Sequence, residues 1–256
     1  MLMYQIRPSE SAATLRDILK IRKITDELHP VARRRLARHG VILNWGNSHA
    51  APHLMEKRWI NPPDKVALAV SKFQSLTKLK AADVPCVEVT RDDQVAQKWN
   101  QQGRCLTRRD GLSGGAGIRE GLVVNMADSF YAKVFPKTHE FRVHVFRGHA
   151  IDFTEKKARH GANVNRLIRS YDNGWNFAHN DLSVTPADKA ELEELAIEAI
   201  EALELDFGAV DLLAILNKEN PRGLKKARVC EVNTAPGLEN TATIDAYVAA
   251  IRSLEE

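Results

Sequence analysis

Two apolar stretches near the C-terminal end of the chain each carry acidic residues, which core strands normally lack. They cover residues 205–216 (LDFGAVDLLAIL) and residues 227–233 (ARVCEVN). Both have the composition of core strands, in which successive side chains point to opposite faces. This alternation places Asp211 on one face of the first strand, and Glu231 and Asn233 on one face of the second. If the two strands pair, the three polar side chains meet on one side of one sheet.

Carboxylates in such a sheet are costly unless another group compensates their charge. Two carboxylates and an amide oxygen form an all-oxygen set, which suits Mg²⁺ holding phosphates. The alternative is an edge strand whose acids point into water, and the spacing alone leaves both interpretations open. Cys230 and Val232 are expected on the face opposite Glu231.

The first 63 residues predict a small αβ unit. A helical pattern follows Ser9, with apolar positions at Leu15, Ile18, Leu19 and Ile24. Residues 41–43 form a short apolar strand. In the turn-rich stretch after it, Trp45 and Asn47 either line a cleft or pack at the strand end. Pro62 and Pro63 interrupt the pattern, and we place a domain boundary there.

Two helices and a strand are predicted between residues 64 and 101. The first helix, 64–82, has an apolar stripe made of Val66, Ala69, Val70, Phe73, Leu76 and Leu79. Lys72 lies off this stripe, where a lysine is usually solvated. Residues 84–90 predict a strand, and residues 92–101 predict a helix.

A glycine-rich segment lies between two short predicted strands. Residues 104–109 (RCLTRR) precede residues 110–117 (DGLSGGAG), and residues 119–124 follow. Glycines let the backbone approach a ligand closely, and unpaired N–H groups can hold phosphate oxygens. The segment is not a Walker A loop or a dinucleotide-binding fingerprint, because no Gly-Lys-Ser/Thr follows and a strand comes next. A plain turn is the alternative, although Arg108 and Arg109 favour phosphate.

A hairpin is predicted from residues 141–146 and 149–153 around Arg147-Gly148. Arg142 lies on the polar face of its strand with Glu140 and His144, so an anion or a neighbouring carboxylate must satisfy it. Residues 131–136 precede the hairpin as a short link, and Lys156-Lys157 ends the second strand. The histidines lack metal-ligand spacing, which favours ordinary polar roles.

Residues 159–179 are polar and irregular, and a loop of this length in a compact domain is either functional or disordered. Its arginines and aromatic residues favour contact with a substrate. Thr185 and Pro186 then begin a strong helix as N-cap and first residue. The apolar stripe of this helix consists of Leu192, Leu195, Ala196, Ala199, Ile200 and Leu203. We expect it to pack on the sheet that carries Asp211 and Glu231.

Composition narrows the classes of protein. The 256-residue chain is long enough for a large core, and its net charge of +4 does not imply a nucleic-acid partner, although basic residues cluster at 33–35, 104–109 and 218–228. Cys86, Cys105 and Cys230 lie far apart without metal-ligand spacing, which indicates reduced core residues and a cytoplasmic location. We expect no signal peptide and no membrane span.

Residues 231–238 (EVNTAPGL) resemble the signature of the ATP-grasp carboxylate–amine ligases, the superfamily of D-alanine–D-alanine ligase and the ribosomal-protein glutamate ligases. Supporting segments come in the family's order, from Lys72 through the glycine-rich loop and Arg142 to Asp211. Other short segments of the sequence also resemble small ATP-grasp proteins of phage and bacterial type. The resemblance implies an α+β (α/β) ATP-grasp fold. Its parts would be an N-terminal αβ domain (1–63), a central lid domain (64–132) and a C-terminal domain with the metal site (133–256).

The resemblance also implies roles for individual residues. Asp211, Glu231 and Asn233 would bind Mg²⁺, with Mn²⁺ as an alternative, and Arg142 and Lys156 would be catalytic. ATP would be bound by Lys72, Arg108, Ser113, Gly114, Gly115, Gly117, Lys133 and Phe135. The substrates would contact Arg169, Asn173, Trp175 and Gly237.

The implied reaction joins a carboxylate to an amine through an acylphosphate, giving ADP and phosphate. The substrates would be small molecules or peptides, and a homo-oligomer is compatible with the sequence. The chain departs from the family pattern at two points. Arg108 stands where a lysine is usual, and residues 131–135 contain no acid for the adenine and ribose. An ATP-grasp-type kinase and a non-catalytic nucleotide-binding module are the alternative functions.

Overall fold

The computed structural model describes residues 1–27, 40–112, 116–124, 127, 129–170, 173–217, 223–238 and 240–254. The helices are α1 (Glu10–Leu19), α3 (Pro52–Met55), α4 (Pro63–Val70), α5 (Lys72–Ala81), α6 (Asp93–Gln101), α7 (Pro186–Ala202) and α8 (Thr241–Arg252). The strands are β1 (Leu2–Tyr4), β2 (Arg22–Ile24), β3 (Val41–Asn44), β4 (Arg58–Ile60), β5 (Val89–Thr90), β6 (Cys105–Arg109), β7 (Arg119–Glu120), β8 (Ser129–Lys133), β9 (His139–Phe146), β10 (His149–Ala158), β11 (Trp175–Ala178), β12 (Phe207–Leu216) and β13 (Leu224–Asn233). No helix in the described ranges is long and apolar enough to cross a bilayer.

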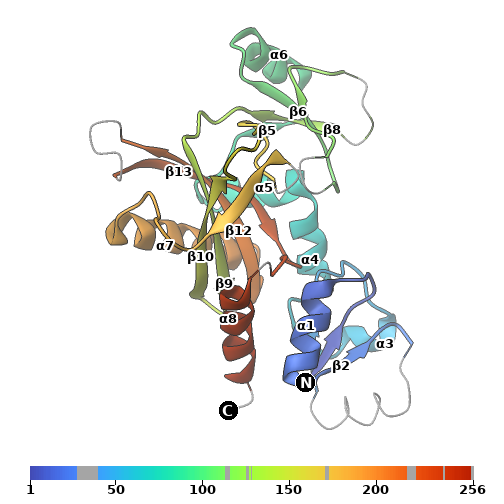
Figure 1. Ribbon diagram of the computed structural model, residues 1–256. Coiled ribbons are helices and arrows are strands. Elements are labelled where there is room, and N and C mark those ends of the chain that lie inside the picture. Colours follow the sequence, from blue (N-terminus) through green and yellow to red (C-terminus); the bar gives the residue numbers. More distant parts are fainter. Residues whose placement is uncertain are drawn as a thin grey trace.

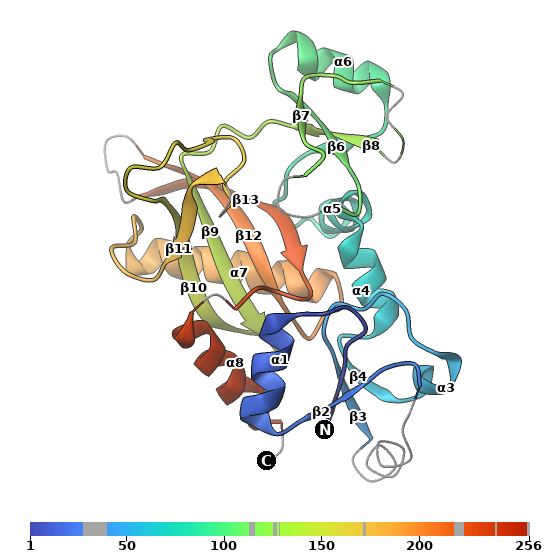
Figure 2. The ribbon, with the colours of Figure 1, turned by 45° about the vertical axis from the view of Figure 1, so that its right-hand side comes forward.

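These strands form three sheets (Figure 1). The central sheet has the order β11-β10-β9-β12-β13, and its neighbouring strands are antiparallel. A small sheet, β5-β8-β6-β7, lies at one end of the molecule, and a parallel sheet, β2-β1-β3-β4, lies at the other (Figure 2). The expected α+β (α/β) class is confirmed by this mixture of helices and sheets.

The central sheet has one apolar face, and its other face is polar around Arg142 and apolar where Phe146 and Phe207 pack with Trp45 and Tyr247. Phe141, Val143 and Val145 of β9 are fully buried in a core shared with α7, while Glu140 and Arg142 point to the other face. Thr185 caps α7 through a capping box with the side chain of the residue three positions on. The predicted hairpin, the N-cap and the packing of this helix on the sheet are confirmed.

The N-terminal sheet holds both confirmed and missed elements. α1 begins after Ser9 as expected, but it ends before Lys20, which has a left-handed φ of 56°, so Ile24 belongs to β2 instead. β1 and β4 are short strands that no pattern predicted. Trp45 stacks on Phe207 of the central sheet with ring centroids 5.3 Å apart, which favours its packing role.

The predicted helix over 64–82 is two helices that meet at Ser71. Ser71 has an extended backbone (ψ 103°), ends α4 and caps α5 by accepting a hydrogen bond from the backbone of Gln74. Asp110 reinforces this break, because its carboxylate accepts from the Ser71 hydroxyl at 2.6 Å and from the backbone N–H of Lys72 at 2.7 Å. Lys72 therefore lies in the first turn of a new helix. Val70, predicted in the stripe, is 43% exposed.

The small sheet differs from the prediction in three places. Only Val89–Thr90 of the predicted strand 84–90 is a strand, and only Arg119–Glu120 of 119–124. The predicted link from residue 131 is instead part of β8, because Phe130, Tyr131 and Ala132 supply buried side chains to that sheet. The helix predicted over residues 92–101 is confirmed as α6, which Asp92 caps.

The segment 159–179 is not irregular throughout. Residues Trp175–Ala178 form β11, which pairs with β10 as an outer strand. β10 is also longer than predicted, so Lys156 lies inside this strand rather than at its end. The additional pairing places Phe177 directly opposite Lys156.

Candidate active site

Strands β12 and β13 bring the three expected oxygen donors together. The strands pair with Asp211 opposite Glu231, and with Ala209 opposite Asn233. All three donors line one cavity on the polar face of the central sheet. The expectation that they share one side of one sheet is confirmed. The Asp211 side chain is 8% exposed, so it is not an acid in open water.

A β-bulge in β13 turns Cys230 toward the same cavity. Asp211 faces Glu231, but the next residue, Leu212, faces Val229, so Cys230 is the extra residue of β13. A bulge of this kind re-aims a side chain. The expectation that Cys230 lies on the face opposite Glu231 is therefore wrong, since both line the cavity. Burial raises the pKa of the Cys230 thiol, which keeps it neutral.

Asp211 is ionised because two cations hold it. Arg142 donates from Nε to Oδ1 at 2.7 Å and from Nη2 to Oδ2 at 3.1 Å, and Lys156 Nζ lies 3.0 Å from Oδ2. Burial opposes the charge, but Arg142 and Lys156 outweigh it and hold the pKa of Asp211 well below its usual range. The same carboxylate contributes to the raised pKa of Lys156.

Glu231 has its own pair of cations. Lys72 Nζ lies 2.6 Å from Oε2 of Glu231, and Arg108 Nη2 lies 3.7 Å from the same oxygen. Burial raises the pKa of Glu231, but Lys72 and Arg108 overcome this and lower it. The interpretation of Lys72 as a solvated helix lysine is wrong, because the start of α5 directs it to β13.

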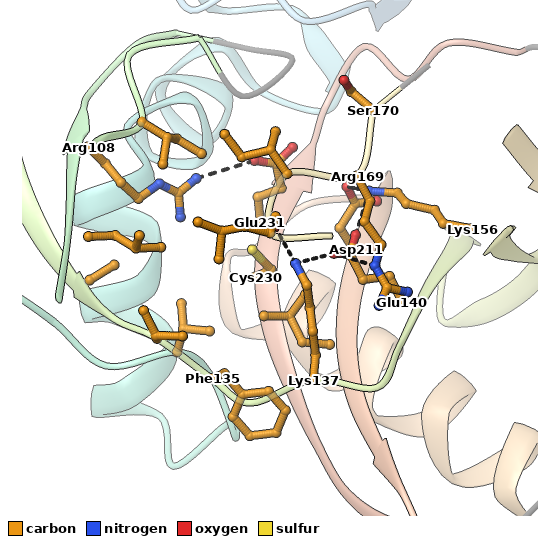
Figure 3. Close-up of a pocket in the computed structure, with 18 of the residues that line it drawn as sticks. Arg108, Phe135, Lys137, Glu140, Lys156, Arg169, Ser170, Asp211, Cys230 and Glu231 are labelled. Atoms are coloured by element: carbon orange, nitrogen blue, oxygen red, sulfur yellow. Dashed lines mark hydrogen bonds and ion pairs between the residues drawn. The ribbon is translucent and has the colours of Figure 1, made fainter. Parts of the chain in front are cut away.

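The cavity has a volume of about 330 Å³ and two chemically different ends. Figure 3 shows Arg108 on one side and Lys156 and Arg169 on the other, with Glu231 and Asp211 between them. The apolar end is lined by Val87, Leu106, Ile118, Ala132, Val134, Phe135, Leu213 and Cys230. The charged end is the side of Lys156 and Arg169. The cavity as a whole has six cationic side chains (Arg108, Lys133, Lys137, Arg142, Lys156, Arg169) and three carboxylates (Glu140, Asp211, Glu231).

A buried acid, Glu140, pairs with several cations at the charged end, although no site role was expected for it. Its carboxylate forms ion pairs with Lys137 and, at 3.1 Å, with Lys156, and Arg169 Nε lies 3.8 Å away. The available signal was strand alternation, which put Glu140 on the face of Arg142. Lys137 had no such signal, because the residues around it show no periodicity.

The loop before β11 covers the cavity beside this cluster. Lys137 Nζ donates to the backbone carbonyl of Leu167 at 2.6 Å. The Arg169 guanidinium lies 4.3 Å from the ring centre of Trp175, and Trp175 Nε1 donates to the carbonyl of Asn165 at 2.9 Å. Arg169 thus lines the cavity, while the buried Trp175 supports the loop that carries it.

Of the other expected site residues, some line the main cavity and some do not. Lys133 and Phe135 line the cavity, and Lys133 also pairs with Glu88 at 2.9 Å. Asn173 donates to the hydroxyl of Ser170 at 2.8 Å, which is a contact within its own loop. Gly237 lines a smaller cavity next to Arg142.

The glycine-rich loop is described only at its ends. Ser113, Gly114 and Gly115 lie outside the described residues. Gly117 has a φ of +74°, and a Cβ there would come within 3.0 Å of the Cβ of Arg109, so this position requires glycine.

Comparisons by sequence find no relative, since no protein-family model and no curated protein matches the chain. Solved structures are similar over nearly the whole chain. The ATP-grasp ligase PsnB, complexed with a minimal precursor, has a TM-score of 0.65 and 13% identity, and the match covers 98% of both chains. D-alanine–D-alanine ligase from Bacillus anthracis has a TM-score of 0.64 and 12% identity, covering 99% of this chain and 97% of its own.

A third similar structure is carboxyaminoimidazole ribonucleotide synthase from Aspergillus clavatus, complexed with ATP. Its TM-score is 0.68 at 13% identity, with 98% of this chain and 76% of that chain covered. At such identities the likeness concerns the fold. The chain therefore has the ATP-grasp fold, as residues 231–238 led us to expect.

Proposed function

We propose that the protein is an ATP-dependent ligase that joins a carboxylate to an amine through an acylphosphate, giving ADP and phosphate. The observation that carries the proposal is the cavity of the ATP-grasp fold, where six cations outnumber three carboxylates. A site with that excess of positive charge suits a polyanion such as triphosphate. ATP-grasp ligases with similar structures support a ligase rather than another use of the nucleotide.

ATP would lie along the cavity. The apolar end, between Leu106 of β6 and Leu213 of β12, suits a flat heterocyclic base. The cations at the other end would contact the phosphates. In this proposal the small sheet and the segment 64–132 act as the lid, and the use of ATP favours a cytoplasmic location.

The donor set fits Mg²⁺, with Mn²⁺ as an alternative. Asp211, Glu231 and Asn233 would hold the ion, since they offer hard oxygen donors from paired strands and both carboxylates are ionised. In the described part of the chain, no group of three or more His, Cys, Asp or Glu residues forms a rival site. The bound ion would neutralise charge on the phosphates.

The cations near these acids would act on the transferred phosphoryl group. An oxygen of the substrate carboxylate attacks the γ-phosphorus, the bond to the β-phosphate oxygen breaks, and ADP leaves with that electron pair. Arg142 would stabilise the charge on the group in flight, worth roughly 3–4 kcal/mol of transition-state stabilisation. Lys72, Arg108 and Lys156 would exchange part of their carboxylate contacts for phosphate oxygens.

The acylphosphate must then meet an amine and not water. The covering loop held by Lys137, Arg169 and Trp175 would limit access of solvent to the charged end. The acceptor would be a small molecule or a peptide. PsnB, whose structures include one with a precursor peptide, supports the peptide option.

The test is ³¹P NMR of the purified protein with Mg-ATP and pooled amino acids, amines and short peptides. ADP and phosphate that appear together, only when carboxylate and amine are both present, would support the ligase. ADP with a new phosphorylated compound and no phosphate would indicate the kinase. Absence of ATP binding would contradict the proposal.

A pair of aspartate variants makes this test specific. Asp211→Asn removes one expected metal ligand and should abolish turnover. Asp245→Asn makes the same change on the exposed side of α8 and should leave it intact. Nucleotide binding that survives Asp211→Asn without turnover in the wild type would favour a non-catalytic nucleotide-binding module.

A further inference from the structure

A histidine–carboxylate pair stands next to the smaller cavity. His179 directly follows β11, and its Nε2 lies 2.8 Å from Oδ1 of Asp152 in β10. The other oxygen of Asp152 accepts a hydrogen bond from the hydroxyl of Thr243, which lines the smaller cavity. The Asp152 side chain is 9% exposed and that of His179 is 28% exposed. The imidazole is therefore oriented by a buried carboxylate and still accessible.

The pair lies in line with the charged end of the main cavity. Along β10, Lys156, Thr154 and Asp152 point to the same face of the central sheet, with Thr154 opposite Arg142 in β9. Lys156 belongs to the main cavity, and Thr154 lines the smaller one. Arg142 lines both cavities. A group in the smaller cavity would thus lie between Arg142 and Thr243, whose hydroxyl is hydrogen-bonded to Asp152.

The smaller cavity also offers polar groups from the loop before α8 and from the first turn of α8. Gly237, Asn240 and Thr243 line it, together with Phe177. Its volume of about 10 Å³ has room for a single polar group, such as the nitrogen of an amine. The acceptor of the proposed ligase would present its nitrogen there and approach the acylphosphate from outside the nucleotide cavity.

Other groups around His179 leave Asp152 as its charged partner. Burial and the nearby Arg142 lower the pKa of His144 in β9 to about 4, so that ring is neutral at pH 7. Burial raises the pKa of Tyr247 in α8, so its hydroxyl keeps its proton. A carboxylate beside an imidazole fixes the proton on the nearer nitrogen and stabilises the imidazolium that forms when the ring accepts another.

We propose that His179 is the general base for the acceptor amine, oriented by Asp152; this rests on the proposed ligase function. Nδ1 of His179 takes one proton from the protonated amine, whose nitrogen then bonds to the acyl carbon and passes its second proton to the departing phosphate. The bond from that carbon to the phosphate oxygen breaks, and its electron pair leaves with phosphate. Nε2 keeps its hydrogen, which stays hydrogen-bonded to Asp152. The imidazolium then returns the extra proton to solvent.

The test compares two acceptors in the same protein. Hydroxylamine is uncharged at neutral pH and traps an acylphosphate as a hydroxamate, whereas an alkyl amine must first lose a proton. With Mg-ATP and pooled amino acids, which supply carboxylates and amines, the hydroxamate and the amide are measured with and without hydroxylamine. His179→Gln should lower the ratio of amide to hydroxamate about 100-fold.

Two further variants separate a base from a structural residue. Asp152→Asn should lower the same ratio, because an amide that donates to Nε2 forces the ring proton onto Nδ1. His149→Gln, at the exposed first residue of β10, should leave the ratio unchanged.

Three results would overturn the proposal. An unchanged ratio in His179→Gln would show that the ring takes no proton, and an equal fall with both acceptors would show a structural role. Wild-type protein that forms neither product would overturn the ligase function and the base together. If the wild type forms hydroxamate, the ligase function stands, and an unchanged ratio in His179→Gln then contradicts only the base.

Discussion

The two faces of the central sheet are made by the same strands and have opposite chemistry. In β12, Leu212 and Ala214 are fully buried against the side covered by α7, whereas Asp211 faces the cavity and is held by Arg142 and Lys156. One residue of displacement along the strand separates an apolar core from a charged site.

Stability and chemistry depend on different faces of the sheet. Burial of apolar area gives the covered face its free energy. On the other face, desolvation of each charge offsets much of the attraction within pairs such as Lys72–Glu231, so these pairs are weak evidence for stability. Substitutions on the covered face should therefore change the free energy of unfolding, and those on the open face should change turnover.

The largest expected effect is on the open face. Arg142→Met removes the guanidinium proposed to stabilise the transferred phosphoryl group, so phosphate release should fall about 100- to 1000-fold. Arg252→Met, the same change at an exposed position in α8, should keep full activity. Product formation by Arg142→Met at the wild-type rate would show that Arg142 on the charged face takes no part in the reaction.

The next effect is on the covered face. Leu212→Ala leaves a cavity beneath α7 and should lower the free energy of unfolding by about 2–5 kcal/mol, measured by urea denaturation. Ile18→Ala, at a side chain that is 41% exposed, should change it by less than about 0.5 kcal/mol. A loss of turnover in folded Leu212→Ala protein would argue against the division between the faces.

A smaller effect, spread over pH, comes from His144, which lies on the Arg142 side of β9 but is buried against Tyr247 of α8. Burial and Arg142 lower its folded pKa from 6.5 to about 4, so the unfolded chain binds this proton first. Stability is thus fully present above pH 6.5 and decreases as pH falls toward 4, by at most about 1.4 kcal/mol per pH unit. Urea titrations across this range should show the decrease in the wild type and less of it in His144→Gln. An identical slope in both proteins would contradict the assignment.

The smallest effect tests the cap of the covering helix. Thr185→Ala removes the N-cap of α7 and should cost about 1 kcal/mol of unfolding free energy. Thr241→Ala changes an exposed first residue of α8, where Asn240 already serves as the cap, and should be close to neutral. Equal losses in the two variants would show that the Thr185 cap adds nothing specific.

Much of the central sheet could be predicted, and much of the small sheet could not. Residues 139–146 alternate, residues 207–216 form a long apolar run, and α7 has a clear cap and stripe, so the local pattern was sufficient. The pattern predicts a link where β8 lies, because the apolar run of Phe130, Tyr131 and Ala132 is short. The break at Ser71 depends on Asp110, which lies 39 positions away.

The chain alone was enough to recognise the strands that carry Asp211, Glu231 and Asn233, the polar face that carries Arg142, and the ATP-grasp signature. Strand alternation and a short motif are local properties, so they can be recognised without a partner. Only the tertiary structure decided that Lys72 reaches Glu231 across 159 positions, that Glu140 gathers Lys137 and Lys156, and that a bulge turns Cys230 into the cavity. These contacts depend on the geometry of strand pairing and helix packing, which no spacing along the chain specifies.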